Sequence, residues 1–145
     1  MPDDSRIQAI IVGSERGVRR LDPTQSYPHA LSALSGINDR QSVLEWTLAA
    51  LAHAGVRDRL FVGGYHIQKV VAKFPSLRFA FHQSWEREGA VGGLVVGLES
   101  AAPGASLVLV MGDVVLRPSA INARIENGFE ARSVGVGLVR VDVGD

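Results

Sequence analysis

The spacing of the hydrophobic residues changes repeatedly along this chain, and this alternation restricts its fold more than any other feature. Short apolar runs predict buried strands, whereas apolar positions three or four residues apart predict amphipathic helices. The predicted strands are residues 7–13, 60–62, 78–81, 106–111 and 134–141, and the predicted helices are 43–54, 67–74, 90–101 and 119–127. This alternation predicts an α/β fold with a doubly wound, mostly parallel sheet that is covered on both faces, in three layers.

The helix predicted after residue 42 carries signals at both of its ends. Ser42 and Glu45 have the spacing of a capping box, in which the Ser hydroxyl accepts a hydrogen bond from a free backbone N–H. Gly55 follows the last apolar position and is expected to end the helix.

The segment from Gly13 to about Arg40 is predicted to be a long polar loop that follows the buried strand ending at Val12. Loops of this length in compact domains are usually functional or disordered. Gly17 would let the backbone approach phosphate oxygens closely. Arg19 would supply planar donors that stay charged. A strand that leads into such a loop is typical of a polyphosphate site.

A second candidate feature lies at the end of the strand 106–111, where Gly112 and Asp113 follow. Open α/β sheets bind their ligands at the carboxyl ends of their strands. Right-handed crossovers bring all of those ends to one edge of the sheet. We therefore expect the loop with Gly17 and Arg19, the pair Gly63-Gly64 and Asp113 to converge on one crevice.

Length and composition favour one domain over residues 1–145, with a core of ordinary size. Lys and Arg together number 15, as do Asp and Glu, so the net charge is zero and neither nucleic acid nor a membrane surface is an expected partner. The chain has no cysteine, which excludes disulfides and thiolate metal sites. The polar start Met1–Ser5 is unlike a signal peptide, and no apolar run approaches about 18 residues, so a cytoplasmic location is expected.

Three common site motifs are absent from the sequence. It contains neither the G-x-G-x-x-G fingerprint of dinucleotide-binding folds nor the G-x-x-x-x-G-K-[ST] phosphate loop. It also lacks a G-x-S-x-G elbow, which argues against a hydrolase of that type.

Several short segments together resemble the nucleotidyltransferases that form sugar nucleotides, which include sugar-1-phosphate nucleotidylyltransferases and phosphocholine cytidylyltransferases. The segments are 13–19, 28–31, 43–46, 54–56, 62–65, the region of Gln83 and 89–92, and Gly112-Asp113. Each motif is weak alone, but they occur in the family's order from about residue 7 to residue 143. The resemblance therefore covers nearly the whole chain.

The resemblance implies transfer of a nucleoside monophosphate from a nucleoside triphosphate to a sugar phosphate or similar small phosphorylated acceptor, with release of pyrophosphate. In that reaction the protein mainly positions groups and neutralises charge. By motif position, the catalytic residues would be Arg19 and His29, the nucleotide-binding residues Gly13, Ser14, Gly17, Gln83 and Gly89, and the Mg²⁺ ligand Asp113. Arg19 would bind the leaving pyrophosphate, while Gln83 and Gly89 would contact the base and ribose.

The sequence departs from the family pattern at three points. Glu15 stands where the family has the first glycine of its loop, and His29 stands where it has a lysine. The family's domain is also longer, and its second metal-binding carboxylate comes after the last strand predicted here. Asp142 and Asp145 are too early in the chain to match that carboxylate, so we expect the chain to stop part-way through the family's fold.

These departures support a second hypothesis, in which the domain is catalytically degenerate. It would then be a regulatory, nucleotide-sensing or scaffold protein that acts through oligomerisation with itself or with a partner chain. Simpler interpretations of single residues also stay open: Asp113 as a turn residue, Arg19 as a solvated side chain beside Arg16 and Arg20, and His29 as a surface residue. Neither the base nor the acceptor follows from the sequence.

The remaining polar residues suggest no further site. His53, His66 and His82 lack the spacing of metal ligands and are predicted to be structural. Glu86 and Glu88 are predicted to form a solvated acidic edge.

Overall fold

A four-stranded parallel sheet forms the centre of the computed structural model, which describes residues 7–13, 16–18, 26–31, 33–34, 38–111, 119 and 121. Its strands are β1 (Ile7–Val12), β6 (Asp58–Gly63), β7 (Arg78–Phe81) and β8 (Ser106–Met111). The strand order is β7-β6-β1-β8, and every neighbouring pair is parallel. The predicted parallel sheet is therefore confirmed, with β1 in its interior.

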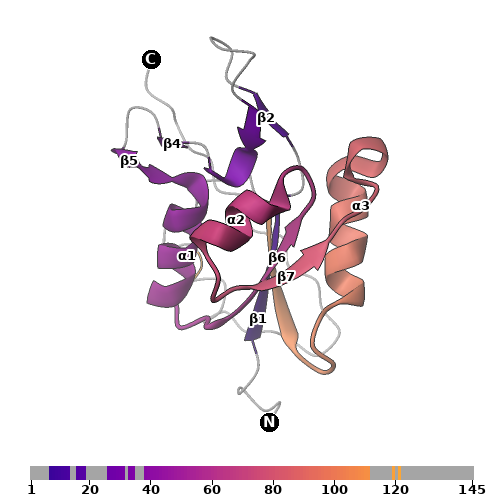
Figure 1. Ribbon diagram of the computed structural model, residues 1–145. Helices are drawn as coiled ribbons and strands as arrows, with labels where there is room; N and C mark the ends of the chain where they lie inside the picture. Colours follow the sequence, from indigo (N-terminus) through magenta and orange to yellow (C-terminus); the bar gives the residue numbers. More distant parts are fainter. Residues whose placement is uncertain are drawn as a thin grey trace.

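Helices cover both faces of this sheet (Figure 1). Helices α1 (Val43–His53) and α2 (Ile67–Lys73) share one apolar core with the β1 and β6 side chains Ala9, Ile11 and Phe61. Helix α3 (Trp85–Glu99) packs on the opposite face, against Ile10 and Val62. The alternation of side chains along β1 supplies both cores, as expected for a strand that is buried on both faces. This arrangement confirms the three-layer, doubly wound fold.

Both end signals of the first helix act as predicted. The Ser42 hydroxyl accepts a hydrogen bond of 3.2 Å from the backbone N–H of Glu45. At the other end, Gly55 has a φ of +81°, and the Val56 N–H donates to the Leu51 carbonyl at 2.9 Å. This is the hydrogen bond of a Schellman motif, which requires a left-handed residue that glycine adopts at little cost.

The long polar loop predicted before α1 is wrong over the described part of that segment. Strands β2 (Arg16–Val18) and β3 (Ser26–Pro28) form an antiparallel pair, and β4 (Ala33–Leu34) pairs with β5 (Asn38–Ser42). A 3-10 helix, η1 (His29–Leu31), lies between them in the chain. Most of these strands are two or three residues long, so they are too short to show a hydrophobic period, and their stability depends on pairing with each other.

Other predicted boundaries differ by less. Helix α3 begins at Trp85 rather than at residue 90. Residues 119 and 121 are helical, as predicted, while the rest of the segment 119–127 and the predicted strand 134–141 lie outside the described residues. Within the described ranges, the structure contains no helix with the length and apolar character needed to cross a bilayer.

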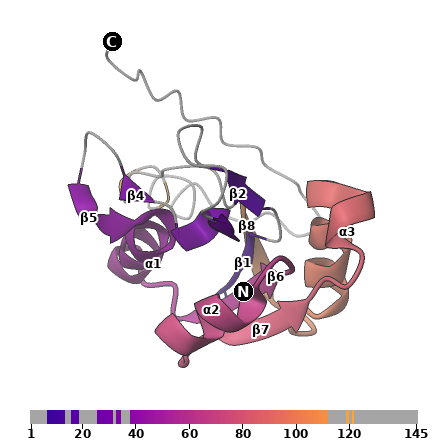
Figure 2. The same cartoon turned by 45° about the horizontal axis from the view of Figure 1, so that its top comes forward.

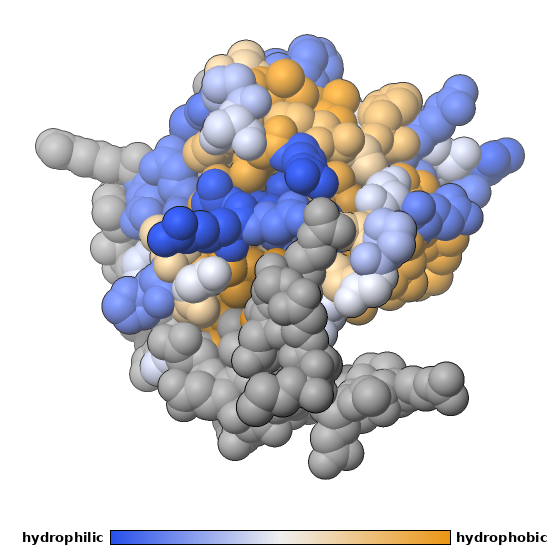
Figure 3. Space-filling model, turned by 90° about the horizontal axis from the view of Figure 1, so that it is seen from below, coloured by the Kyte–Doolittle hydropathy of each residue, from blue (hydrophilic) through white to orange (hydrophobic). Residues whose placement is uncertain are grey.

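A buried glutamine joins β1 to its neighbours near the amino ends of the strands. Gln8 is buried, its side-chain carbonyl accepts a hydrogen bond of 2.8 Å from the Ala102 N–H, and its amide donates to Asp58 at 3.3 Å. Asp58 also lies 3.8 Å from Arg78. Figure 3 views the molecule from this end and shows hydrophilic residues between apolar areas.

Replacing Gln8 with leucine is expected to lower the free energy of unfolding by about 1–3 kcal/mol, because the partly buried Ala102 N–H loses its acceptor. Urea denaturation followed by circular dichroism measures this change. The matched control is Gln68→Leu on α2, where the glutamine is exposed and the expected change is within about 0.5 kcal/mol. Equal losses in the two variants would contradict the role given to the Gln8 hydrogen bonds.

Candidate functional site

The strand order places the candidate site at the carboxyl ends of β1 and β8. From β1 the chain continues to β6 and then to β7, on one side of β1. It returns through α3, on the other face of the sheet, to β8, which lies on the opposite side of β1. The order therefore reverses between β1 and β8, and open α/β sheets bind ligands at such a reversal. Val12 and Met111 are opposite each other in register, so β1 and β8 end side by side at this edge of the sheet. Figure 2 tilts this end of the sheet toward the viewer.

Gly13, which has no side chain, lies at this end of the sheet. Its N–H donates to the Val62 carbonyl at 2.9 Å, which holds it beside the end of β6. A side chain here would place its Cβ 2.6 Å from ring carbons of Phe61, so the packing requires glycine. The same Cβ position lies 3.7 Å from the Ala30 side chain. The 3-10 helix η1, which contains His29, therefore flanks Gly13.

An aromatic cluster lies at the end of β6. The Tyr65 ring packs edge-on against Trp85, with centroids 5.2 Å apart, and against His66 at 4.3 Å. A Cβ on Gly64 would lie 2.5 Å from the Trp85 Cβ, so this glycine lets the backbone and Trp85 approach each other closely. The start of α3 is thereby packed against the carboxyl end of the sheet.

Gln83 and Gly89 lie at the two ends of the segment that joins β7 to the main part of α3. The His82 N–H donates to the Gly63 carbonyl at 2.8 Å, which ties the start of this segment to β6, and the Gln83 side chain is exposed. Gly89 interrupts the helix with φ of +60° and ψ of −151°. This backbone conformation is open essentially to glycine alone. A Cβ at Gly89 would meet nothing within 4 Å, so a ligand could approach its backbone from outside.

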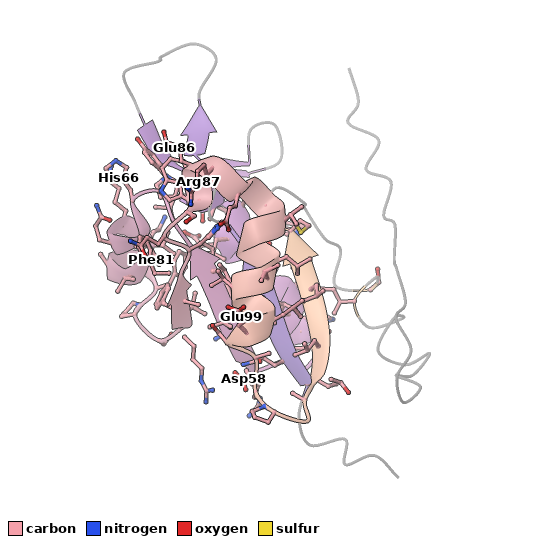
Figure 4. The ribbon with its side chains drawn as sticks, turned by 90° about the vertical axis from the view of Figure 1, so that its right-hand side faces the viewer. Asp58, His66, Phe81, Glu86, Arg87 and Glu99 are labelled. Atoms are coloured by element: carbon pink, nitrogen blue, oxygen red, sulfur yellow. The ribbon has the colours of Figure 1, made fainter. Side chains whose placement is uncertain are left out.

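One contact at this segment was not foreseen from the sequence. The His82 imidazole is buried, and its Nε2 lies 3.2 Å from a carboxylate oxygen of Glu88. Glu88 is exposed, as predicted for an acidic edge, with half of its side chain accessible to solvent, but its carboxylate also contacts a buried side chain. Glu86 fits the solvated interpretation, because it is exposed, and Figure 4 shows it with Arg87 at the end of the molecule opposite Asp58. The 82/88 spacing carried no signal, because residues six apart are not neighbours on a continuous helix.

The structure thus gathers part of the predicted site. It brings Gly13 and the segment from Gln83 to Gly89 to one edge of the sheet, and it describes the backbone of Gly17 in β2 and of His29 in η1. Ser14, Arg19 and Asp113 lie outside the described residues. Among the residues that are described, no group of three or more His, Asp or Glu side chains could hold a metal ion. The binding roles of all eight residues stay predictions.

The fold and the position of the site define a doubly wound α/β domain with a nucleotidyltransferase-like architecture. Sequence comparison identifies the family directly: residues 24–140 match the family model of the MobA-like NTP transferase domain. The chain belongs to this family, which confirms the class of protein indicated by the sequence motifs.

Several solved structures share the fold of this chain. A nucleotidyl transferase from Methanothermobacter matches with a TM-score of 0.61 and 19% identity, over 84% of this chain and 57% of that one. Rv0371c from Mycobacterium tuberculosis matches with a TM-score of 0.64 and 22% identity, over 83% of this chain and 59% of that one. CTP:phosphocholine cytidylyltransferase from Streptococcus pneumoniae matches with a TM-score of 0.58 and 19% identity, over 79% and 50% of the two chains.

These comparisons also define the extent of the likeness. The chain spans less than two thirds of the length of each of these structures. Rv0371c has also been solved in complex with manganese. Among curated protein sequences, none is significantly similar to this chain.

Proposed function

We propose that this chain transfers a nucleoside monophosphate from a nucleoside triphosphate to a small phosphorylated acceptor, such as a sugar phosphate, and releases pyrophosphate. The observation that carries the proposal is the meeting of Gly13, the end of β8 and the segment Gln83–Gly89 at one edge of a doubly wound sheet. Membership of the MobA-like family supports the nucleoside triphosphate as substrate.

The proposed reaction is an in-line displacement. An oxygen of the acceptor phosphate forms a bond to the α-phosphorus, and the bond from that phosphorus to the bridging oxygen breaks, so that pyrophosphate leaves with the electron pair. Gly13 would let the chain pass close to the phosphates, backbone N–H groups at Ser14 and Gly17 would hold the phosphate oxygens, and Arg19 would neutralise the leaving pyrophosphate. His29, where the family has lysine, would face the same phosphates.

Asp113 is the proposed ligand of Mg²⁺. It comes two residues after β8, whose last residue is paired with Val12 at the edge where Gly13 lies. A carboxylate beside substrate phosphates suits Mg²⁺, which binds through one or two carboxylates and phosphate oxygens. When bound, the ion would supply charge neutralisation to the triphosphate.

Replacing Asp113 with alanine is expected to weaken Mg²⁺-dependent triphosphate binding by about tenfold or more, because the ion loses a charged ligand. Calorimetric titration with ATP, CTP, GTP and UTP, with and without Mg²⁺, measures this and identifies the base. The control is Glu99→Ala, which removes an exposed carboxylate at the far end of α3. If the unmodified chain binds none of the four triphosphates, the proposed function is wrong.

A second candidate function is that of a regulatory or scaffold domain that acts through oligomerisation. It is supported by Glu15 and His29, and by the exposed apolar side chains Val91, Val95 and Leu98 on α3, which are 74%, 48% and 46% exposed. Spacings of four and three residues put them on one side of the helix. The same titration separates the two functions, because only the first requires triphosphate binding. Sedimentation of the chain as a monomer would count against the second.

A further inference from the structure

The contact between His82 and Glu88 connects two places that are separated in the chain by a turn. His82 is the residue after β7, and Glu88 is the residue before the break in α3. The two side chains meet at 3.2 Å between Nε2 and a carboxylate oxygen. Because an ionised carboxylate only accepts hydrogen bonds, the imidazole Nε2 is the donor.

On the side of Gly92, the backbone packs closely against this contact. A Cβ on Gly92 would lie 2.8 Å from the His82 Nε2 and 2.5 Å from the Glu88 carboxylate. The two side chains therefore rest directly against the backbone of Gly92, in the first turn of the helix after Gly89. The contact holds β7, the short turn before Gly89 and the helix after it in one arrangement.

The segment enclosed by this contact is held by backbone hydrogen bonds at its two ends and by an aromatic contact between them. The His82 N–H is bound to the Gly63 carbonyl, and the Glu88 N–H donates to the Ser84 carbonyl at 2.9 Å. Trp85, within the segment, packs against Tyr65. Gln83 directly follows His82, and Gly89 directly follows Glu88, so the contact sets the separation of the two residues proposed to bind the base and ribose.

We propose that His82 and Glu88 are positioning residues, whose contact closes the segment Gln83–Gly89 into the shape that receives the base and ribose of a nucleoside triphosphate. This inference rests on the proposed function, because the segment Gln83–Gly89 binds a base and ribose only if the chain binds a nucleoside triphosphate. The contact fixes the segment before the nucleotide arrives, and a segment that is already ordered loses less conformational entropy on binding.

The test compares Glu86 with Glu88. Glu86 lies three residues before the break at Gly89, and Glu88 lies directly before it. Each is replaced by alanine, and ATP, CTP, GTP and UTP are titrated with Mg²⁺ into each variant and the unmodified chain. The triphosphate is anionic, so loss of a nearby negative charge alone would strengthen its binding in both variants. Loss of a positioning contact weakens binding by about tenfold, and only in Glu88→Ala.

Two further variants examine the contact itself. Glu88→Gln keeps an acceptor oxygen for His82 and is expected to restore binding to within about threefold of the unmodified chain. Gly92→Ala puts a methyl group into the space occupied by the contact and is expected to weaken binding as Glu88→Ala does. Because Glu88 is half exposed, neither Glu88 variant is expected to unfold the chain, and circular dichroism verifies this.

Trp85 supplies a measurement that needs no nucleotide. The chain has two tryptophans, Trp46 and Trp85, so a Trp46→Phe background leaves Trp85 as the sole emitter. Opening of the enclosed segment in Glu88→Ala is expected to increase acrylamide quenching of Trp85, with no increase in Glu86→Ala.

The outcomes separate this inference from the proposed function. Weaker binding and greater quenching in Glu88→Ala alone support it. If the unmodified chain binds a triphosphate and Glu88→Ala binds it as Glu86→Ala does, the positioning role is wrong and the proposed function stands. Unchanged quenching in Glu88→Ala also overturns the inference. If the unmodified chain binds no triphosphate, the proposed function fails and the positioning role fails with it.

Discussion

Replacing Phe61 with alanine is expected to lower the free energy of unfolding by about 3–5 kcal/mol, the largest stability effect that the structure predicts for one side chain. Phe61 is fully buried in the larger core, and its ring packs edge-on against Phe79 with centroids 6.1 Å apart. The ring also fills the space beneath Gly13 and Gly63. Its removal therefore leaves a cavity directly below the candidate site. Urea denaturation measures the loss.

The matched control for this prediction is Phe81→Ala in the same sheet. Phe81 is 57% exposed on the edge strand β7, so its loss is expected to change stability by about 0.5 kcal/mol at most. Should Phe61→Ala fail to fold, Phe61→Leu retains most of the volume and is expected to show a smaller loss of the same sign. Similar stabilities for Phe61→Ala and Phe81→Ala would contradict the packing described here.

Replacing Gly89 with alanine is expected to lower the free energy of unfolding by about 1–3 kcal/mol and to weaken triphosphate binding by about tenfold. The cause is the backbone alone, because an added Cβ would meet nothing within 4 Å. With φ of +60° and ψ of −151°, an L side chain is strained, and the turn can relieve that strain only by changing shape. Denaturation measures the first effect and calorimetric titration the second.

Gly55→Ala is the control that separates strain from a role in binding. Gly55 also has a positive φ, +81°, with open space around it, but it ends α1 rather than facing the candidate site. Its replacement is expected to cost about 1–2 kcal/mol of stability and to leave triphosphate binding unchanged. Equal losses of binding in both variants would mean that stability, and not the Gly89 turn, governs affinity.

The main elements of the sheet were predictable because their signals are local and strong. Strands β1 and β8 each contain a run of consecutive apolar residues, 9–12 and 107–111, as expected for parallel strands in a sheet that is covered on both faces. Ser42 and Gly55 marked the ends of α1 because caps depend on the chemistry of one or two neighbouring residues. The short strands before α1 were missed because each is stabilised by a partner strand and has no pattern of its own.

The candidate site was predictable in part. The motif order identified Gly13, Gln83 and Gly89, and the structure brings these three to one edge of the sheet, while their binding roles stay predictions. The early start of α3 at Trp85 was missed, because that turn is separated from the rest of the helix by the non-helical Gly89. The partner of His82 was missed for the same reason: the break at Gly89 reorients Glu88 in a way that helical spacing cannot describe.

The sequence by itself determined the class of fold, the family and the chain positions of most elements, because hydrophobic period, caps and short motifs act over a few residues. Only the tertiary structure decided which strands are neighbours, that the order reverses between β1 and β8, and that His82 meets Glu88 against the backbone of Gly92. These features depend on contacts between residues that are brought together by packing and by backbone conformations at single glycines. Such contacts satisfy buried polar groups and fill space, and they produce no repeating pattern of residues in the sequence.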